Sequence, residues 1–450
     1  MSTRPPEPPA MPDPLRIVNG IRFRRHAPSF FLDALRRYGD ASRFYLVRRK
    51  VYLLFGPDYA ERVLGTNAPN YPRAGYDKLA SLLGAGLLSS EGEAWRVQRK
   101  IAQPAFTPQR LRGVVGALTA AVEDSSERLD RAAEAAAPVD VEQEMNRLAL
   151  AMLGRTMFGK DFSASAAGVN DALRYVLHYG TKRIGNPLAL PPSVPTPKNR
   201  RHRKALARLD EVVYALIDER RRRGGNGEDL LSSLVETPDP RTGVPMDDRL
   251  LRDNVMTFLT AGHETTAKAL TWSLYLTHRH PAHAETVREE ARRTLAYGTL
   301  DHARLSELVH TERFAREAIR LYTPVPALAR KVLEDDEVGG YRIVGGSRVI
   351  VSPYATHRHP GFWEYPERFE PERFTPENSK ERHHYAYLPF GRGPRQCIAS
   401  NFALMEMRVA LATLLSRFSF SAVGDGEPDT EALFTLRPRN GMPMHIARVT

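Results

Sequence analysis

The sequence predicts a mainly α-helical protein with small β-sheets. Most of its 450 residues follow amphipathic helical periodicity between proline and glycine breaks. One helical pattern, from Asp247 to His280, is unusually long. Strand-like pieces are short and lie near the two ends of the chain, at Arg43–Leu54, Tyr341–Val351 and Leu433–Ile446.

The domain organisation is predicted to be simple. Residues 1–14 are rich in proline and poor in apolar residues, so they are expected to form a flexible arm. A chain of this length suggests about three domains on average. Residues 15–450 contain no Gly/Ser-rich linker, however, and a single domain is therefore expected. A second proline-rich and then basic segment, Pro187–Lys204, is predicted to be a mobile surface loop.

The overall composition narrows the class of protein. No run of eighteen apolar residues and no signal peptide is present, which predicts a soluble, cytoplasmic protein without a membrane anchor, most simply a monomer. The formal net charge is +12, but the charges are scattered, so nucleic-acid binding is not expected. Arg96, Arg99, Lys100 and Arg392 could instead dock an acidic protein partner.

The most informative segment is Phe390-Gly391-Arg392-Gly393-Pro394-Arg395-Gln396-Cys397-Ile398-Ala399, which contains the only cysteine of the chain. Glycines and a proline predict a tight loop, and an apolar periodic run, Ile398–Phe418, follows it. If that run is a helix, Cys397 lies at its N-terminus, where the helix dipole and free N–H groups favour a thiolate. A lone electron-rich thiolate suits an axial iron ligand.

Other uses of this cysteine fit less well. A phosphatase loop would need arginine six residues after the nucleophile, where the chain has Ala403. A zinc site would need further thiolates or a tighter set of histidines. A buried, inert cysteine is the usual alternative for a lone thiol, but it would not need the surrounding glycines and arginines.

The long helix contains a local conflict at its centre. Ala261-Gly262-His263-Glu264-Thr265-Thr266 places a glycine, a carboxylate and two β-branched hydroxyl residues in mid-helix. Glycine costs up to about 1 kcal/mol there, and threonine can bond to the carbonyl four residues earlier and bend the helix. Such a conflict indicates a functional site.

These segments together resemble motifs of the cytochrome P450 family. Phe390, Gly393, Arg395 and Cys397 match its haem-binding loop Phe-x-x-Gly-x-Arg-x-Cys-x-Gly, with Ala399 in place of the last glycine. The segment from Ala261 to Thr266 resembles its distal-helix motif, Ala/Gly-Gly-x-Asp/Glu-Thr. Three further segments resemble the Glu-x-x-Arg helix, its Pro-x-Arg-Phe partner and the Trp-x-x-x-Arg helix: Glu317–Arg320, Pro371–Phe374 and Trp95–Arg99. The resemblance runs from about Leu15 to the C-terminus and implies the P450 fold.

The resemblance also implies roles for individual residues. Cys397 would be the axial ligand of the haem iron, Thr265 would hydrogen-bond to activated dioxygen, and Glu264 would relay protons from solvent. Glu317, Arg320 and Arg373 would form a buried structural network. The residues holding haem b would be Trp95, Arg99, Ala261, Gly262, Arg330, Phe390, Gly393, Arg395 and Ala399. The substrate pocket would draw on Tyr76–Leu88, Pro187–Pro197, Phe258, Val325, Leu328 and Phe434.

The implied activity is monooxygenation of a hydrophobic small molecule by O2, by hydroxylation or epoxidation. The implied substrate is a natural-product intermediate, such as a terpenoid or polyketide, or alternatively a fatty acid. Because no flavin or iron–sulfur segment is apparent, electrons are expected from a separate ferredoxin and its NAD(P)H-dependent reductase. A P450 that uses peroxide or rearranges its substrate, and a haem-binding sensor or carrier, are the alternatives.

Two further patterns have simpler interpretations. The histidine pairs His278/His280, His357/His359 and His383/His384 lack a matched set of carboxylates and are expected on the surface. Gly84-Ala85-Gly86-Leu87-Leu88-Ser89 superficially resembles a nucleotide-binding loop. It lacks the third glycine and a clear preceding strand, so an ordinary turn is expected.

Overall fold

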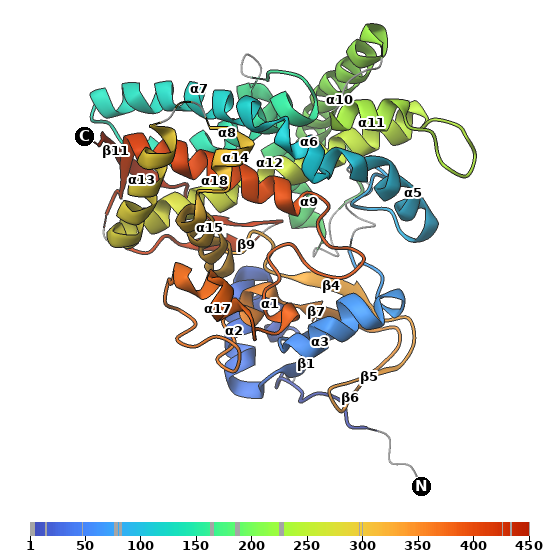
Figure 1. Ribbon diagram of the computed structural model, residues 1–450. Helices are drawn as coiled ribbons and strands as arrows, with labels where there is room; N and C mark the ends of the chain where they lie inside the picture. The colour runs from blue at the N-terminus through green and yellow to red at the C-terminus, as the bar shows by residue number, and fades with distance from the viewer. Residues whose placement is uncertain are drawn as a thin grey trace. The chain divides into compact units, whose positions relative to one another are not determined.

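The computed structural model divides the chain into two compact units (Figure 1). Unit 1 comprises residues 1–75, 317–397 and 430–436, and unit 2 comprises residues 76–316, 398–429 and 437–450. The structure describes residues 5–13, 16–46, 48–75, 80, 83–162, 166–184, 190–224, 229–296, 298, 300–424, 426–432 and 434–449. The single domain expected from the sequence for residues 15–450 stays a prediction.

Unit 1 is built on a four-stranded sheet of order β1-β2-β7-β4. β1 (Ala41–Leu46) and β4 (Leu328–Lys331) run antiparallel to their neighbours, whereas β2 (Arg49–Leu54) and β7 (Arg348–Val351) are parallel to each other. The other elements of this unit are α1 (Val18–Arg25), α2 (Ala27–Tyr38), α3 (Pro57–Glu61), the π turn η1 (Arg62–Thr66), η2 (Ala68–Asn70), β5 (Asp336–Val338), β6 (Tyr341–Ile343), α16 (Pro353–Thr356), η4 (Pro371–Phe374), α17 (Pro376–Ser379), η5 (His384–Ala386) and β9 (Thr430–Ala432).

This sheet is buried on both faces. Because side chains alternate along a strand, Val51 and Leu53 of β2 point to one face and Tyr52 and Leu54 to the other. The first pair packs in a cluster with Phe30 and Phe31 of α2, and the second pair in a cluster that includes Leu388. Leu388 lies just before the cysteine-containing loop, so the sheet anchors that loop.

Unit 2 is mainly helical. Its elements are α5 (Gly92–Ala102), η3 (Gln103–Phe106), α6 (Pro108–Arg112), α7 (Val115–Glu134), β3 (Val139–Asp140), α8 (Val141–Met157), α9 (Ala166–Ile184), α10 (Pro197–Arg223), α11 (Leu230–Glu236), α12 (Asp248–Arg279), α13 (Pro281–Leu295), α14 (His302–Leu305), α18 (Ser400–Arg417), β8 (Phe418–Ala422) and β11 (Pro443–Arg448). Two elements contain residues of both units: α15 (Val309–Leu321) and β10 (Leu436–Pro438).

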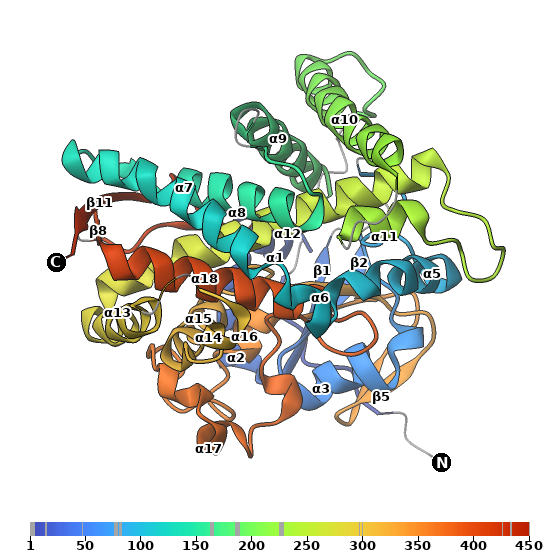
Figure 2. The ribbon, with the colours of Figure 1, turned by 45° about the horizontal axis from the view of Figure 1, so that its top comes forward.

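The long helix expected from the sequence is α12, and it forms the centre of unit 2 (Figure 2). The Asp247 carboxylate accepts a hydrogen bond from the Leu250 N–H at 2.7 Å and so caps the helix, which ends before Pro281. α12 packs against α8 on one side and α18 on another. A helix covered in this way must be apolar nearly all round, and its polar side chains need partners.

The structure confirms the mainly α-helical class with small sheets and adds several corrections. Strands occur in all three expected pieces, but the sequence analysis missed β3, β4, β5, β8 and β9. The expected loop Pro187–Lys204 is wrong in its second half, because α10 begins at Pro197, where the Thr196 hydroxyl accepts a hydrogen bond from the Asn199 N–H at 3.1 Å. Residues 187–189 of that loop lie outside the described residues, as do residues 76–79 and 81–82 of the predicted pocket.

Residues 5–13 of the proline-rich arm make defined contacts. Glu7 forms an ion pair with Lys50 at 2.7 Å, and the Arg43 N–H donates to the Pro9 carbonyl at 2.8 Å. These contacts join the arm to β1 and β2. The flexibility expected for residues 1–14 stays a prediction.

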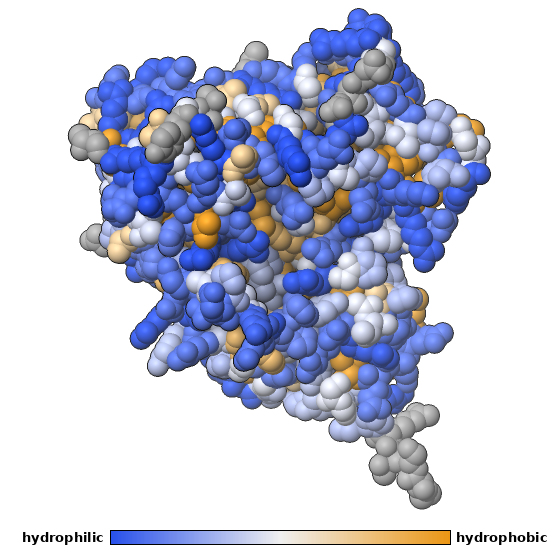
Figure 3. Space-filling model, in the orientation of Figure 1, coloured by the Kyte–Doolittle hydropathy of each residue, from blue (hydrophilic) through white to orange (hydrophobic). Residues whose placement is uncertain are grey.

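The surface is largely hydrophilic on the face that Figure 3 shows, which agrees with the many arginines of the chain. Among the described residues, none of the helices combines enough length with enough apolar character to cross a bilayer.

Candidate active site

The cysteine-containing loop of unit 1 is held by its own backbone. The Cys397 N–H donates to the Phe390 carbonyl at 2.9 Å, and the Gly391 N–H donates to the Leu388 carbonyl at 3.0 Å. Gly391 and Gly393 have φ values of +64° and +74°, a region that favours glycine. A Cβ on Gly393 would lie 1.8 Å from the Leu64 carbonyl oxygen of η1. The loop can therefore approach η1 only with glycine at position 393, and it leaves Cys397 exposed.

The helix that follows the cysteine begins slightly later than the sequence suggested. α18 starts at Ser400, with Ala399 as its N-cap residue, so Cys397 lies just before the helix. Ala399 has φ −100°, a conformation that any L-residue adopts. The family motif has glycine at this position, and the negative φ explains why alanine is accommodated here.

The other site residues predicted in unit 1 lie on β4 or in loops. Arg330 is 7% exposed, and its guanidinium donates to the Ala329 carbonyl at 3.0 Å. Phe390 and Arg395 are half-buried in the loop itself. The side chain of Leu328 reaches within 3.8 Å of the position of a Cβ on Gly391, which places this predicted pocket residue beside the loop. Val325 and Phe434 are half-buried.

Glu317, Arg320 and Arg373 lie together in unit 1. Glu317 and Arg320 have fully buried side chains and form a two-pronged ion pair, with N···O distances of 2.6 and 2.8 Å. Arg373 approaches Glu317 at 3.4 Å. The remaining Arg320 N–H groups donate to backbone carbonyls at 2.7–2.9 Å, those of residues His357, Pro366 and Arg368. The charges of Glu317 and Arg320 are thus paired and hydrogen-bonded, as a buried ion pair requires, whereas Arg373 Nε is buried without a hydrogen-bond partner.

His357 extends this network to the cysteine loop. Its Nε2 accepts a hydrogen bond from the Leu388 N–H at 2.7 Å, so Nδ1 carries the proton and donates to the Arg320 carbonyl at 3.0 Å. Burial lowers the pKa of His357 to about 3, and the ring is neutral. The sequence analysis expected His357 and His359 on the surface, and this was wrong, since they are 0% and 8% exposed.

In unit 2, the centre of α12 has an uncovered window. Every residue from Leu251 to Thr277 is buried except Ala261, Gly262 and Thr265, which are half-buried. Ala261 and Thr265 are one turn apart and share a face, so these residues form one small opening in a covered helix. Phe258, three residues before Ala261, is 8% exposed and stacks on Phe106 at 5.9 Å.

The helix is continuous through this window. The Thr265 hydroxyl donates to the Ala261 carbonyl at 2.8 Å, which is the bond that the sequence suggested. Thr260 and Thr271 make the same kind of bond, at 2.7 Å each, so this bond alone does not distinguish the window. A Cβ on Gly262 would lie 3.0 Å from the Leu153 side chain of α8, which gives the glycine a packing role.

The carboxyl groups near the window have different environments. Glu264 is buried and lies 3.7 Å from the Lys268 ammonium, one turn later. Glu406 of α18 accepts a hydrogen bond from the Thr266 hydroxyl at 2.9 Å, and its other carboxyl oxygen is buried without a hydrogen-bond partner. Burial raises the pKa of Glu406 to about 8, so this group is mostly protonated at neutral pH. Glu406 was not among the site residues predicted from the sequence, although an acid inside an apolar helical run is a visible signal.

Trp95 and Arg99 lie one turn apart on α5, with the guanidinium 5.8 Å from the centre of the indole ring. Both are half-buried and line an open cavity of about 420 Å3, which Arg96, Lys100 and Gln103 also line. The cavity thus presents an indole and three cationic side chains, a set suited to carboxylate groups.

The glycine-rich segment at Gly84–Ser89 is a structural loop. The Ala85 N–H donates to the Asp253 carboxylate at 2.7 Å, and the Leu87 N–H donates to the Asn254 side chain at 3.0 Å. A Cβ on Gly84 or Gly86 would collide with residues of α12, at 2.0 and 2.3 Å. Close approach to α12 therefore explains both glycines, and a phosphate is not needed.

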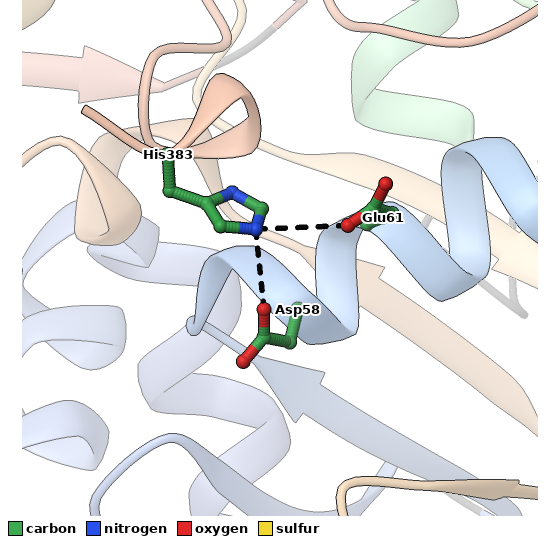
Figure 4. A group of neighbouring side chains, drawn as sticks. All are labelled: Asp58, Glu61 and His383. Atoms are coloured by element: carbon green, nitrogen blue, oxygen red, sulfur yellow. Dashed lines mark ion pairs between the residues drawn. The ribbon is translucent and has the colours of Figure 1, made fainter. Parts of the chain in front are cut away.

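Figure 4 shows the one group of His, Cys, Asp and Glu side chains that could hold a metal among the described residues: Asp58, Glu61 and His383. The His383 Nε2 lies 3.2 Å from Asp58 and 3.6 Å from Glu61. Its Nδ1 accepts a hydrogen bond from the Tyr385 N–H at 3.1 Å, which leaves the proton on Nε2. In this tautomer Nε2 is a donor to the carboxylates and is not available to a cation.

The residues present fit a haem group. The exposed thiol of the only cysteine can supply the iron ligand. The Trp95 and Arg99 cavity has donors for the propionates, and the small side chains of the α12 window leave room beside a flat ring.

Comparisons with known proteins agree with this chemistry. The family model described as Cytochrome P450 matches residues 5–444. The chain is 34% identical to Cyclooctatin synthase of Streptomyces melanosporofaciens over 93% of this chain and 89% of that protein. It is 34% identical to Cyclooctat-9-en-7-ol 5-monooxygenase of the same organism, over 94% and 92% of the two chains.

A solved structure shows the same fold. The crystal structure of the cytochrome P450DA heme domain superposes with a TM-score of 0.89 at 27% sequence identity, covering 100% of this chain and 99% of that one. With the family model, these relatives and this structure in agreement, the chain belongs to the cytochrome P450 family and is a haem-iron monooxygenase.

Proposed function

We propose that this monooxygenase carries haem b and oxidises a cyclic terpenoid, by hydroxylation or epoxidation. The observation that carries the proposal is the window on α12, because Ala261, Gly262 and Thr265 form the uncovered patch of an otherwise buried helix. A hydroxyl and two small residues on such a patch leave space for O2 and substrate beside the helix.

In this proposal the protein holds the cofactor with three kinds of side chain. Cys397 binds the iron, and Trp95, Arg99, Arg330 and Arg395 bind the propionates. Gly393 and Ala399 allow the loop to approach the ring closely. When bound, the haem supplies the redox chemistry that activates O2, and the thiolate ligand favours O–O cleavage.

The overall reaction defines what the protein must deliver. One oxygen atom enters a C–H or C=C bond of the substrate, and the other leaves as water with two protons and two electrons. In the proposed relay, Glu264 takes up protons that come from solvent, and the Thr265 hydroxyl passes them towards the window. Proton transfer by positioned side chains of this kind contributes about 10²–10⁴-fold to a rate.

The terpenoid class is supported by the relatives. Cyclooctat-9-en-7-ol 5-monooxygenase is named for an unsaturated cyclic alcohol, and this chain aligns with nearly all of it. The predicted pocket residues Phe258, Val325, Leu328 and Phe434 are apolar, which suits a substrate composed mainly of hydrocarbon.

The electrons would come from a ferredoxin and its NAD(P)H-dependent reductase. Arg96 and Lys100 are exposed on α5, and the chain has a net charge of +12, which favours encounter with an acidic carrier. We place the reaction in the cytoplasm.

An optical titration of the haem-loaded protein tests the proposal. Cyclic terpenoid alcohols are expected to move the Soret band from its low-spin to its high-spin position. Fatty acids, steroids and macrolides are the comparison set. A shift with fatty acids alone would identify a fatty-acid hydroxylase. Turnover that proceeds with peroxide but not with O2 and reduced ferredoxin would favour the peroxide-using alternative, and binding without turnover would indicate a sensor or carrier.

A variant pair tests the ligand. Cys397→Ala is expected to abolish the thiolate-haem spectrum, whereas Ala399→Gly, in the same loop, is expected to keep it. A preserved spectrum in Cys397→Ala would overturn the assignment of the iron ligand.

A further inference from the structure

Lys268 is a buried cation on α12, one turn after Glu264. Its side chain is 2% exposed, and a buried ammonium is costly unless it is paired and hydrogen-bonded. Its Nζ lies 2.9 Å from the Glu142 carboxylate and donates to the Asn146 side-chain oxygen at 3.1 Å. The third partner, Glu264, lies at 3.7 Å. One ammonium is therefore shared by two carboxylates, and the shorter contact is made to Glu142.

The partners of Lys268 are fixed on α8. Glu142 and Asn146 are one turn apart, and the Asn146 amide N–H donates to the Glu142 carbonyl at 2.8 Å. The Asn146 side-chain oxygen is thereby turned to accept from Lys268. The Asn146 backbone carbonyl accepts a hydrogen bond from His263 Nε2 at 3.1 Å. Asn146 of α8 therefore contacts both His263, which precedes Glu264 in the chain, and Lys268, which lies one turn after Glu264.

The surrounding ionisable groups add little charge. Burial lowers the pKa of His263 to about 4, so this ring is neutral near pH 7. Glu406 of α18, bonded to Thr266, has a pKa raised to about 8 by burial and is mostly protonated. β8 also packs on α12 and has no ionisable residue. On α10, Asp210 forms an ion pair with Arg252, and Arg252 lies three turns before Glu264 on α12. Among these groups, Lys268 is the cation that contacts Glu264, and Glu142 is the carboxylate that competes for it.

The unequal sharing has a functional consequence. A carboxylate tied by a short ion pair would stay ionised and fixed, and could not readily accept a proton. A carboxylate with no cation would be held protonated by burial and could not readily release one. At 3.7 Å, with Glu142 as a nearer competitor for the ammonium, Glu264 lies between these extremes.

We propose that Lys268 is a positioning residue for proton delivery, and that Glu142 tunes its effect by competing for the ammonium. This inference rests on the proposed function, in which Glu264 carries protons to the window. It assigns a role to two residues outside the family's motif and makes the α8–α12 contact part of the reaction machinery.

The first measurement is an infrared pH titration of the carboxyl band of Glu264 in the haem-loaded protein. The band is assigned by subtracting a spectrum in which the same protein also carries Glu264→Gln. Lys268→Met is expected to raise the midpoint by about 1–2 pH units, because an opposite charge is lost. Glu142→Gln is expected to lower it, by up to about one unit, because Lys268 then has a single carboxylate partner. Lys268→Arg is expected to restore the midpoint.

Controls separate this role from simple stabilisation. Lys160→Met makes the same change at an exposed ion pair with Glu219 and is expected to leave the band in place. If Lys268→Met does not fold, the double variant Lys268→Met/Glu142→Gln removes both buried charges, and its midpoint is expected to lie above that of Glu142→Gln. Midpoints that stay in place, or that move in the same direction in both single variants, would overturn the inference.

The second measurement is product formed per electron consumed, as a function of pH. The pH at which this ratio changes is expected to follow the infrared midpoint of Glu264 in each variant. If Glu264→Gln leaves this coupling unchanged, the relay itself is absent and the proposed function fails together with the inference. If Glu264→Gln uncouples the enzyme but the Lys268 and Glu142 variants leave its pH profile unmoved, the relay stands and only the inference fails.

Discussion

Two buried charge networks, one in each unit, differ in how completely they are satisfied. In unit 1, Glu317 and Arg320 are fully buried and joined by two short bonds, and backbone carbonyls accept the remaining Arg320 N–H groups. In unit 2, Lys268 is shared between two carboxylates, one of them at 3.7 Å. His263 Nδ1 and one Glu406 oxygen nearby are buried without hydrogen-bond partners.

This difference separates architecture from chemistry. An ion pair in which every charged group has short bonds, as Glu317 and Arg320 do, has one low-energy arrangement, so it fixes a loop but cannot change state cheaply. A network with a long contact and unfilled bonding capacity can gain or lose a proton at little cost. We therefore expect changes in the first network to reduce stability, and changes in the second to alter pH dependence and coupling.

The largest effect is expected from Arg320→Ala. It leaves the Glu317 carboxylate buried with the 3.4 Å contact to Arg373 and a hydrogen bond from the Glu370 N–H at 2.8 Å, and removal of one partner of a buried pair costs about 3–5 kcal/mol. Arg316→Ala, on the same helix, removes a partly exposed pair with Glu312 and should cost about 0–1 kcal/mol. Urea denaturation of both variants measures the difference. Equal losses would show that burial adds nothing to the contribution of the Glu317–Arg320 pair.

Glu406→Gln should change how stability depends on pH. The pKa of Glu406 is raised from 4.5 to about 8 in the folded protein, so the folded state holds its proton more tightly than the unfolded state does. Its contribution is complete below about pH 4.5 and is lost as the pH rises towards 8, with a slope of at most about 1.4 kcal/mol per pH unit.

The measurement is the free energy of unfolding between pH 5 and 8, taken as wild type minus variant. We expect this difference to fall as the pH rises. If this difference does not change with pH, Glu406 does not contribute to the pH dependence of stability. Its assignment as a buried, incompletely hydrogen-bonded acid near Lys268 would then be weakened.

Thr265→Ala should alter coupling with little change in stability. We expect product formed per electron to fall by about tenfold or more, because the hydroxyl in the window can no longer pass protons. Thr271→Ala is the matched control, since Thr271 makes the same bond to the carbonyl four residues earlier but is fully buried away from the window. Similar uncoupling in both variants would point to a change in the helix and away from the hydroxyl.

The smallest effect is expected from His383→Ala. The ion pairs of His383 with Asp58 and Glu61 are partly exposed, and such pairs contribute about 0–1 kcal/mol. Because Nε2 carries the proton, added Zn²⁺ should not raise the melting temperature of the wild type above that of the variant. Stabilisation by zinc that the variant loses would show that the ring changes tautomer to bind metal.

The sequence was a good guide where the signal was local. The cap at Asp247 and the stop at Pro281 predicted the long helix, and the glycines around Cys397 predicted a tight loop. The start of α10 was also readable, since Thr196 followed by Pro197 is a common N-terminal helix signal. The prolines and basic residues of the same segment favour a loop and mask this signal.

The remaining features depend on contacts between distant residues. His357 is buried because it bridges Arg320 and Leu388, and His359 because its Nε2 pairs with Asp40 at 2.8 Å, separations that periodicity cannot show. Lys268 looks like an ordinary helix residue until α8 places Glu142 against it. For the same reason, the charge-sharing beside Glu264 could be found only in three dimensions.

The geometry of the cysteine loop also bears on how this gene can vary. Position 393 combines a positive φ with a carbonyl oxygen in the place of any Cβ, so every codon change that replaces glycine there should be lost from a selected library. Position 399 has neither restriction, and alanine already occupies it. Within one decapeptide, the backbone therefore prevents the replacement of Gly393 and permits substitution at position 399.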